Sequence, residues 1–281
     1  FTPAISAVIT RLLTHEGFCN SYLKPHFRGN LKWYFSTWLL TPAVAYFGAI
    51  LCFLIFPSTF DPLGSSYSIC SGLTTTLQYI SQLMRMIPLA ILINPIMGIL
   101  LCFGEEFGWR GYLLPKLNEK YTPICVRYSY GNHMGSMAAP FVAMGYNYGE
   151  GHPLANILAM IVFSVAIGTI QGFLFFRTRS IWPSVLFHAA ENGMDLWAPS
   201  DLFMSKTPNL FIGPNIVGII GGIGFVIVAI CCLPFLLKQA NGDTAIQINR
   251  TFGMKTARGL RFEYNERGRI KEGHRRDATP Q

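Results

Sequence analysis

The sequence predicts an all-α fold, a polytopic bundle of about six to eight transmembrane helices. Only 13% of its 281 residues are charged and 51% are hydrophobic, whereas a soluble globular protein usually has about 25% charged residues. The mean hydropathy is +0.36, and apolar runs cover most of residues 33–237. Because so few charges cannot cover a soluble surface, we expect an integral membrane protein whose surface faces lipid.

The apolar runs define the expected elements in order. A spanning helix needs about 20 mostly apolar residues. We expect spans at 33–56, at 73–103 with a helical continuation through 105–117, and at 124–148, 154–176, 181–197 and 212–237. Two prolines, Pro88 and Pro95, leave open whether 73–103 is one kinked helix or two shorter ones.

The chain outside these runs is polar or basic. Residues 1–32 form a basic interfacial segment, which includes a short apolar stretch at 3–13, and residues 57–71 form a turn-rich loop. The expected organisation is this N-terminal segment, a transmembrane domain at 33–237 and a basic tail at 238–281. The tail holds ten Lys/Arg against five Asp/Glu.

Basic residues also predict the orientation. If the spans alternate, every basic cluster falls on one side of the membrane, and the loops 57–72, 149–153 and 198–211 fall on the other with a single lysine. The positive-inside rule then predicts a cytoplasmic C-terminus and contact with membrane lipid. We expect no nucleic-acid partner, because no groove-reading or stacking motif accompanies the net charge of +8.

Two adjacent carboxylates, Glu105 and Glu106, follow about 30 apolar residues. Ionisable groups at membrane depth are costly and usually functional. On a helix, Glu106 and Arg110 are four residues apart and can pair. Glu105 points about 100° away and is free to face a cavity, where a desolvated carboxylate suits a general base acting on water. The structural alternative is a helix start at the interface, with both glutamates complementing the helix dipole.

A second polar pair lies in the apolar run after Trp182. His188 and Asn192 are four residues apart and share one helix face. A buried histidine and asparagine can bind a metal or donate hydrogen bonds to a developing oxyanion. The alternative is that they pack helices together through hydrogen bonds to neighbouring spans. Glu191 points elsewhere, and we expect it at the interface.

Taken together, the two segments resemble the CPBP family, which contains the type 2 CAAX prenyl proteases and bacteriocin-processing or self-immunity proteins. The pattern is Glu-Glu-x-x-x-Arg followed about 80 residues later by His-x-x-x-Asn. The surroundings are similar too: Phe-Gly-Trp-Arg-Gly-Tyr-Leu-Leu-Pro at 107–115, Arg-Thr-Arg-Ser-Ile-Trp-Pro-Ser-Val-Leu at 177–186, and the loop at 144–148. The resemblance covers about residues 75–200.

The resemblance implies a role for each residue of the two motifs. Glu105 would be the water-activating base, with Glu106 and Arg110 as a supporting pair. His188 would position or ligate the nucleophile, and Asn192 would stabilise the tetrahedral oxyanion. The sequence leaves two alternatives open: a zinc ion held by Glu105 and His188, or a glutamate-activated water alone.

One position departs from the family pattern. Members carry a middle histidine before x-Pro, and if Pro140 is the anchor, Ala138 occupies its place. His133 is five residues earlier, about 140° round a helix, and His152 lies in the next loop, on the side assigned away from Glu105.

The resemblance therefore implies an intramembrane endopeptidase that hydrolyses a peptide bond of a membrane-associated or prenylated substrate. Ala138 favours an alternative, a catalytically impaired family member that acts as a membrane peptide-binding or immunity protein. A small proton-relaying transporter is a second alternative, which inverted repeats would favour, and the sequence shows none. The expected location is the cell membrane of a prokaryote.

Overall fold

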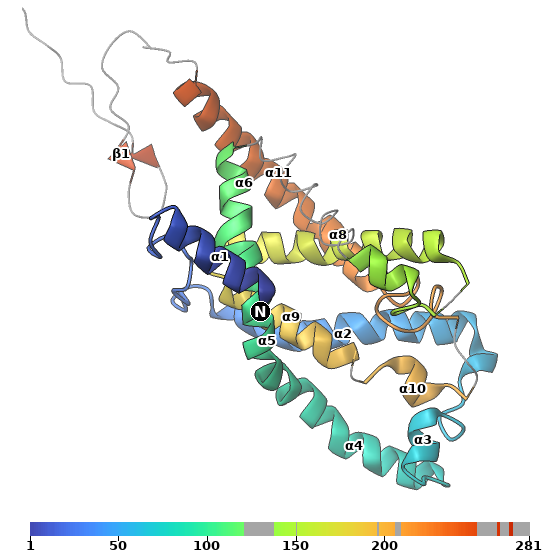
Figure 1. Cartoon of the computed structure of the whole chain (residues 1–281). Helices are drawn as coiled ribbons and strands as arrows, with labels where there is room; N and C mark the ends of the chain where they lie inside the picture. Colours follow the sequence, from blue (N-terminus) through green and yellow to red (C-terminus); the bar gives the residue numbers. More distant parts are fainter. Residues whose placement is uncertain are drawn as a thin grey trace, which may run out of the picture. The chain divides into compact units, whose positions relative to one another are not determined.

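The computed structural model describes residues 1–120, 138–149, 151–195, 197–205, 209–251, 263–264 and 270–271. The chain forms two compact units, Phe1–Asn241 and Gly242–Gln281. The regular secondary structure of the described residues is almost entirely helical, which confirms the all-α prediction (Figure 1). The exception is a short antiparallel ribbon in the second unit, in which Glu263 pairs with Lys271.

The elements follow one another in a simple order. The helices are α1 (Thr2–Leu13), α2 (Leu31–Ile55), η1 (Pro57–Thr59), α3 (Ser66–Cys70), α4 (Thr76–Leu92), α5 (Asn94–Gly108), η2 (Trp109–Leu113), α6 (Leu114–Lys120), α8 (Pro153–Thr178), α9 (Trp182–Asp195), α10 (Pro199–Phe203) and α11 (Ile223–Thr251), and the strands are β1 (Glu263–Tyr264) and β2 (Ile270–Lys271). Residues 138–143 are also helical.

Three helical stretches are long and apolar enough to cross a membrane. They are α2, the run Thr76–Glu119 formed by α4 to α6, and α8; two shorter apolar helices are α1 and the Ile223–Gln239 part of α11. The helices expected at 33–56, at 73–103 with the continuation at 105–117, and at 154–176 are therefore confirmed as candidate spans. Most of the span expected at 124–148 lies outside the described residues.

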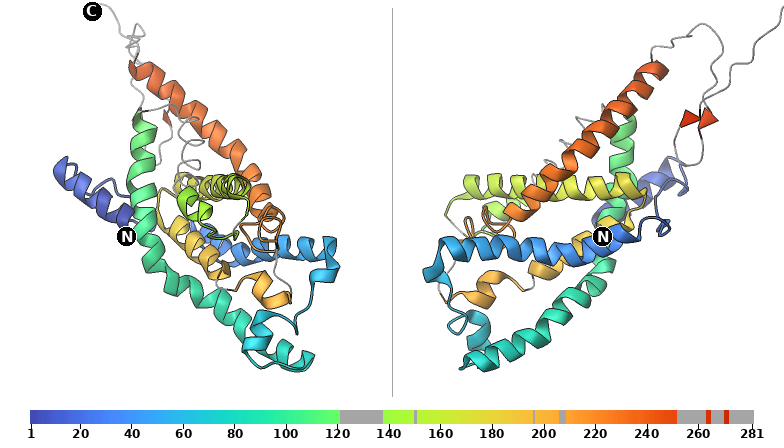
Figure 2. Two further views of the ribbon diagram at one scale, coloured as in Figure 1. Left: turned by 45° about the vertical axis from the view of Figure 1, so that its right-hand side comes forward. Right: turned by 180° about the vertical axis from the view of Figure 1, so that it is seen from behind.

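The run from Thr76 to Glu119 is divided, which answers the question left open by its prolines. A turn at Ile93 separates α4 from α5, and Pro95 stands in the first turn of α5, where its missing N–H and fixed φ are tolerated. Pro88, by contrast, lies inside α4. Figure 2 shows α4 and α5 following each other along one side of the helical unit.

Two expected spans are shorter than the sequence suggested. The helix in 181–197 is α9, whose 14 residues reach only about 21 Å, less than a hydrocarbon core of about 30 Å. Residues 212–222 form turns, and α11 begins only at Ile223. The segment contains Pro214 and several glycines, which are poor helix formers.

Helices α5 and α9 pack closely and position the site. A Cβ atom added to Gly98 would lie 3.3 Å from the Cβ of Ala189, and one added to Gly193 would lie 3.3 Å from the Cβ of Asn94. These small residues let the two backbones approach. Because the start of α5 meets the end of α9, the two helices run antiparallel, which brings a polar residue of each to the same level.

Helix α1 covers another face of α5. A Cβ atom on Gly108 would lie 2.5 Å from the carbonyl carbon of Pro3, and one on Gly104 would meet the ring of Phe1 at 2.4 Å. Arg11, buried in α1, donates from Nη2 to the carbonyl of Gly111 at 3.0 Å. A short apolar stretch that the sequence assigns to the interface thus packs directly on the helix that carries the paired glutamates.

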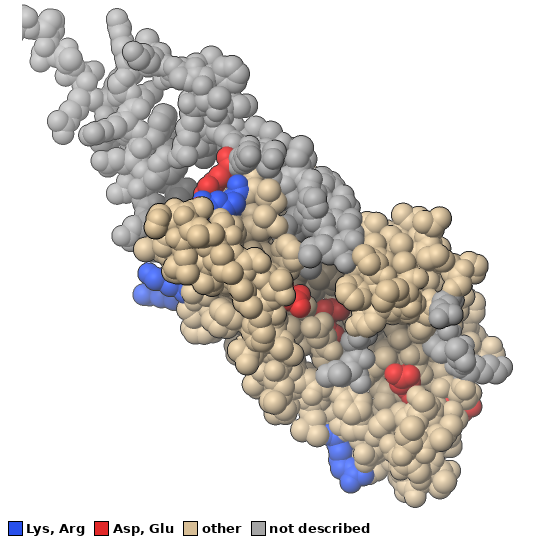
Figure 3. Space-filling view, viewed as in Figure 1, with Lys and Arg blue, Asp and Glu red and all other residues tan. Residues whose placement is uncertain are grey.

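The outer surface of the spans is strongly apolar. Large side chains on α4 and α5 are mostly exposed, among them Leu77, Met84, Met97, Leu100 and Leu101. Figure 3 shows the same character, with charged atoms confined to small patches. Since soluble proteins rarely expose contiguous apolar surface of this kind, the surface fits a lipid environment.

Candidate active site

A buried ion pair lies at the centre of the candidate site. Glu106 near the end of α5 and Arg110 in η2 are both fully buried, and Arg110 Nη1 donates to Glu106 Oε1 at 2.8 Å. This confirms the pairing predicted from their spacing. A buried charge pair of this kind contributes little net stability, because the cost of desolvating both charges offsets their attraction.

Arg110 belongs to an unusual turn. Residues Trp109–Leu113 form a π-helix between the α-helical segments α5 and α6. Single π-helical turns inside α-helices often mark functional sites. Here the wider turn carries the arginine that neutralises Glu106.

Gln171 of α8 completes the pair, and the sequence analysis missed it. Its Oε1 accepts from Arg110 Nη2 at 2.5 Å, and its Nε2 donates to Glu106 Oε1 at 3.1 Å. The side chain is fully buried. The available signal was its position as an amide side chain in the second half of an apolar span, where polar side chains are costly.

His188 of α9 is the third donor to Glu106. Its Nδ1 lies 3.0 Å from Glu106 Oε1, and 13% of its side chain is exposed. In the neutral imidazole, a carboxylate at Nδ1 favours the proton on this nitrogen, which leaves Nε2 with a lone pair. The imidazole is thereby held in one tautomer by a carboxylate from another helix.

The two oxygens of Glu106 differ sharply. Oε1 has three neighbours, Arg110, Gln171 and His188, whereas Oε2 is buried and has no hydrogen-bond partner among the described residues. Buried polar atoms are seldom unpaired in native proteins, and an ordered water is a common partner. Oε2 is therefore a natural acceptor for a water molecule beside His188.

Glu105, the predicted base, is exposed. Within the described part of the chain it makes no side-chain hydrogen bond, but it lies within electrostatic range of His188. The carboxylate that bonds the imidazole is Glu106, which the sequence assigned to a supporting pair with Arg110. Burial explains the difference, since only the inward-facing glutamate reaches α9.

Asn192 lies one helical turn from His188. It is exposed as a residue, and its Nδ2 is 3.5 Å from Cys102 Sγ on α5. Glu191, expected at the interface, is buried with 8% exposure and lies within electrostatic range of both Cys102 and His188. The expectation for Glu191 was wrong, because α9 is packed on more than one side.

The position of the missing histidine is partly described. Ala138 is half-buried in the short helix at 138–143 and packs against the main apolar cluster. His152 is exposed at the start of α8. His133 lies outside the described residues.

The described donors do not fit a catalytic zinc ion. Such sites use three protein ligands, and the described residues contain no group of three or more His, Cys, Asp or Glu able to hold a metal. Glu106 Oε1 is already occupied by three donors. The predicted pair of Glu105 and His188 would therefore lack a third ligand in this part of the chain.

The site lies beside a recess in the molecular surface. In Figure 3, acidic side chains gather at a hollow in the middle of the face, where α5 and α9 meet in Figure 1. This hollow gives exposed carboxylates a place near the partly exposed imidazole. The arrangement can hold a water molecule among charged and hydrogen-bonding groups, which is what general acid–base hydrolysis requires.

The fold and site define an integral membrane protein of the α-helical class, with a polar cluster buried between its helices. Residues 84–194 match the family described as Type II CAAX prenyl endopeptidase Rce1-like. This matched segment is similar to that family and contains all six polar residues of the site. No curated protein matches the chain.

Proposed function

We propose that this protein is an intramembrane endopeptidase that cleaves a peptide bond of a membrane-associated or prenylated protein with a glutamate-activated water. The observation that carries the proposal is the Glu106–His188 bond at 3.0 Å, which joins α5 and α9 beside an exposed second carboxylate. The family domain supports the same reaction class.

In the proposed mechanism Glu105 is the general base. It is adjacent to the buried cluster and makes no hydrogen bond with the described residues, so its oxygens are available to a water. It would take a proton from this water as the oxygen attacks the substrate carbonyl, and then return the proton to the leaving amine.

The other residues would orient the imidazole of His188 and stabilise the tetrahedral intermediate. Arg110 and Gln171 hold Glu106, and Glu106 holds His188 in the tautomer that presents Nε2 to the water. The amide of Asn192, one turn away on α9, would donate to the oxyanion of the tetrahedral intermediate. Because the described donors do not make up a zinc site, none of these steps uses a metal.

Peptide cleavage by the purified chain in lipid vesicles tests the proposal. We expect Glu105→Gln to lower kcat by about 100-fold or more, the usual contribution of a general base, without loss of folding. Glu119→Gln, a change of the same kind at an exposed residue of α6, is the matched control and should leave kcat unchanged. Full activity in Glu105→Gln would reject this base. If Glu105→Gln remained active and Glu106→Gln abolished cleavage in a folded protein, the base would be Glu106.

Ala138 favours the second candidate, a family member that binds peptides without cleaving them. If the wild type binds but does not cleave, and Ala138→His creates cleavage, the second candidate is supported. Wild-type cleavage that Ala138→His leaves unchanged would remove it.

The proposed setting is a prokaryotic cell membrane with a cytoplasmic C-terminus. The proposed orientation rests on the distribution of basic residues, with ten Lys/Arg in 238–281. Protease accessibility of a C-terminal epitope in sealed vesicles of known orientation would check it.

A further inference from the structure

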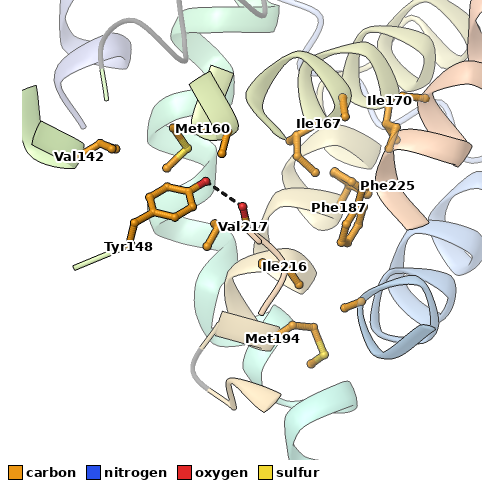
Figure 4. Close-up of a cluster of buried hydrophobic side chains, with 14 of the residues drawn as sticks. Val142, Tyr148, Met160, Ile167, Ile170, Phe187, Met194, Ile216, Val217 and Phe225 are labelled. Atoms are coloured by element: carbon orange, nitrogen blue, oxygen red, sulfur yellow. Dashed lines mark hydrogen bonds between the residues drawn. The ribbon is translucent and has the colours of Figure 1, made fainter. Parts of the chain in front are cut away.

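An apolar groove runs between α2, α8 and α11, away from the polar cluster. Its volume is about 380 Å³, within the range of small-molecule sites. Ile170, Phe187 and Phe225 form part of its wall, and Figure 4 shows these three side chains facing one another. The lining is apolar apart from three hydroxyl and two thiol side chains.

At one end of the groove three aromatic rings meet, one from each helix. The ring of Phe173 lies 5.2 Å from that of Trp33 and 5.1 Å from that of Phe235, both edge-on. Trp33 stands in the first turn of α2. Tryptophan at the end of a span commonly marks the level of the lipid headgroups.

Cations lie immediately beyond these rings. The guanidinium of Arg177 lies 5.9 Å from the ring centre of Trp33 and 5.5 Å from that of Phe235, and the ammonium of Lys32 lies 5.2 Å from Trp33. On α11, Lys238 follows the groove residue Cys231 by seven positions and so shares its helix face.

The three cations come from three helices and are all exposed. None of them forms an ion pair with a carboxylate of the described residues. Their charge is therefore available to a ligand at the aromatic end of the groove.

We propose that this groove binds a phospholipid with an anionic headgroup, its phosphate held by Lys32, Arg177 and Lys238 and one acyl chain lying along the groove. Along α2 the groove extends from Trp33 to Val44, about 16 Å at 1.5 Å per residue. This is about half of a hydrocarbon core of about 30 Å, the depth of one leaflet. Basic pockets between spanning helices bind anionic headgroups in this way.

A second groove shows what distinguishes the proposed site. It has a volume of about 440 Å³ and lies between the first half of α8 and residues 211–226. No charged residue lines either groove, but only the proposed site has Arg177 and Lys32 stacked on an aromatic residue of its lining, Trp33. General lipid contact would fill both grooves alike, whereas a headgroup preference belongs only to the groove with cations at its end.

Native mass spectrometry of the purified full chain tests the proposal. The detergent-solubilised protein is titrated with phosphatidylglycerol or phosphatidylcholine carrying identical acyl chains. We expect one phosphatidylglycerol to be retained per protein in preference to phosphatidylcholine. The double variant Lys32→Gln/Arg177→Gln should weaken this preference roughly 25-fold, about fivefold per cation.

Arg179→Gln is the matched control, because Arg179 is exposed on the same turn but lies over Phe176, outside the groove. It should keep the preference. Ser36→Trp, which fills the groove without changing charge, should abolish retention in a protein with unchanged unfolding temperature.

Three results would overturn the proposal. They are equal retention of the two lipids, equal loss in Arg179→Gln and the double variant, and displacement of the lipid by inorganic phosphate or by a farnesylated peptide. The last would identify the groove as a site for free anions or for the substrate's isoprenoid.

Discussion

Three donors from three elements converge on one oxygen, Glu106 Oε1. Arg110 neutralises the carboxylate, and Gln171 links the carboxylate and the arginine to α8. The carboxylate in turn orients the imidazole of His188. Each partner alone would leave the buried carboxylate with too little compensation for its lost hydration. The cluster therefore depends on all of its members. Its uncharged member, Gln171, contributes the weakest hydrogen bonds.

Gln171→Leu should weaken the whole cluster, because it removes hydrogen bonds to two charged groups at once. We expect a loss of about 1–3 kcal/mol in the free energy of unfolding, measured by denaturant unfolding in mild detergent. The control is Thr169→Val on the same helix, whose hydroxyl bonds only to the carbonyl of Val165 and whose loss should change little. Equal effects of the two variants would show that the hydrogen bonds of Gln171 to the ion pair add nothing to the free energy of unfolding.

The sequence predicts this site in part. The spacing of Glu106 and Arg110 determined their pairing because both lie on one helical run, so local geometry was sufficient. Gln171 was missed because its partners are more than 60 residues away, and only the packing of α8 brings them together. For the same reason the sequence could not tell which glutamate reaches His188.

Among elements, the contact between α1 and α5 is the most demanding. Gly104 and Gly108 leave no space for a side chain, since a Cβ atom on Gly104 would overlap the ring of Phe1 and one on Gly108 would lie 2.5 Å from Pro3 of α1. In membranes, small residues four apart commonly allow helices to approach this closely. The N-terminal segment is thus part of the packed structure around the site.

Gly108→Ala should destabilise the protein by about 1–3 kcal/mol, the typical cost of overpacking. Gly172→Ala is the control, since a Cβ atom there meets nothing within 4 Å. The control should be neutral or stabilise α8 by roughly 0.5–1 kcal/mol, because alanine is the better helix former. Unfolding temperatures of the two variants, compared with the wild type, measure the difference. A stabilised Gly108→Ala would contradict the close contact.

At this scale the sequence predicted the long helices well and the short ones poorly. Hydropathy identified α2 and α8 almost to the residue, because nothing interrupts their apolar runs. Residues 212–222 are also apolar but do not form a helix. Glycine and proline have low helix propensity, so tertiary packing determines the conformation of this segment. Hydropathy alone does not distinguish a spanning helix from buried irregular chain.

For the whole molecule, the division after Asn241 separates a compact membrane unit from the C-terminal residues. The sequence placed its boundary at residue 237, at the end of the apolar run. The charges of the tail could be counted from the sequence, but the end of a compact unit depends on contacts.

Removal of Gly242–Gln281 should therefore leave the first unit folded. We expect the unfolding free energy to change by less than about 1 kcal/mol, a shift of about 2–4 °C in Tm, and the shortened chain to resist extraction from membranes by alkaline carbonate. A matched full-length sample serves as reference. Aggregation of the shortened chain, or its release by carbonate, would show that the first unit is not self-sufficient.

The π-helical turn at Trp109–Leu113 also sets the rotational phase between two halves of one long helix. Each α-helical residue advances the chain by about 100°, so deletion of one residue here would rotate everything that follows by that angle. Lys116, which lies 2.9 Å from Glu16, would then point elsewhere while Glu106 stayed in place. The protein should thus tolerate insertions or deletions in this turn far less well than substitutions of its outward-facing side chains.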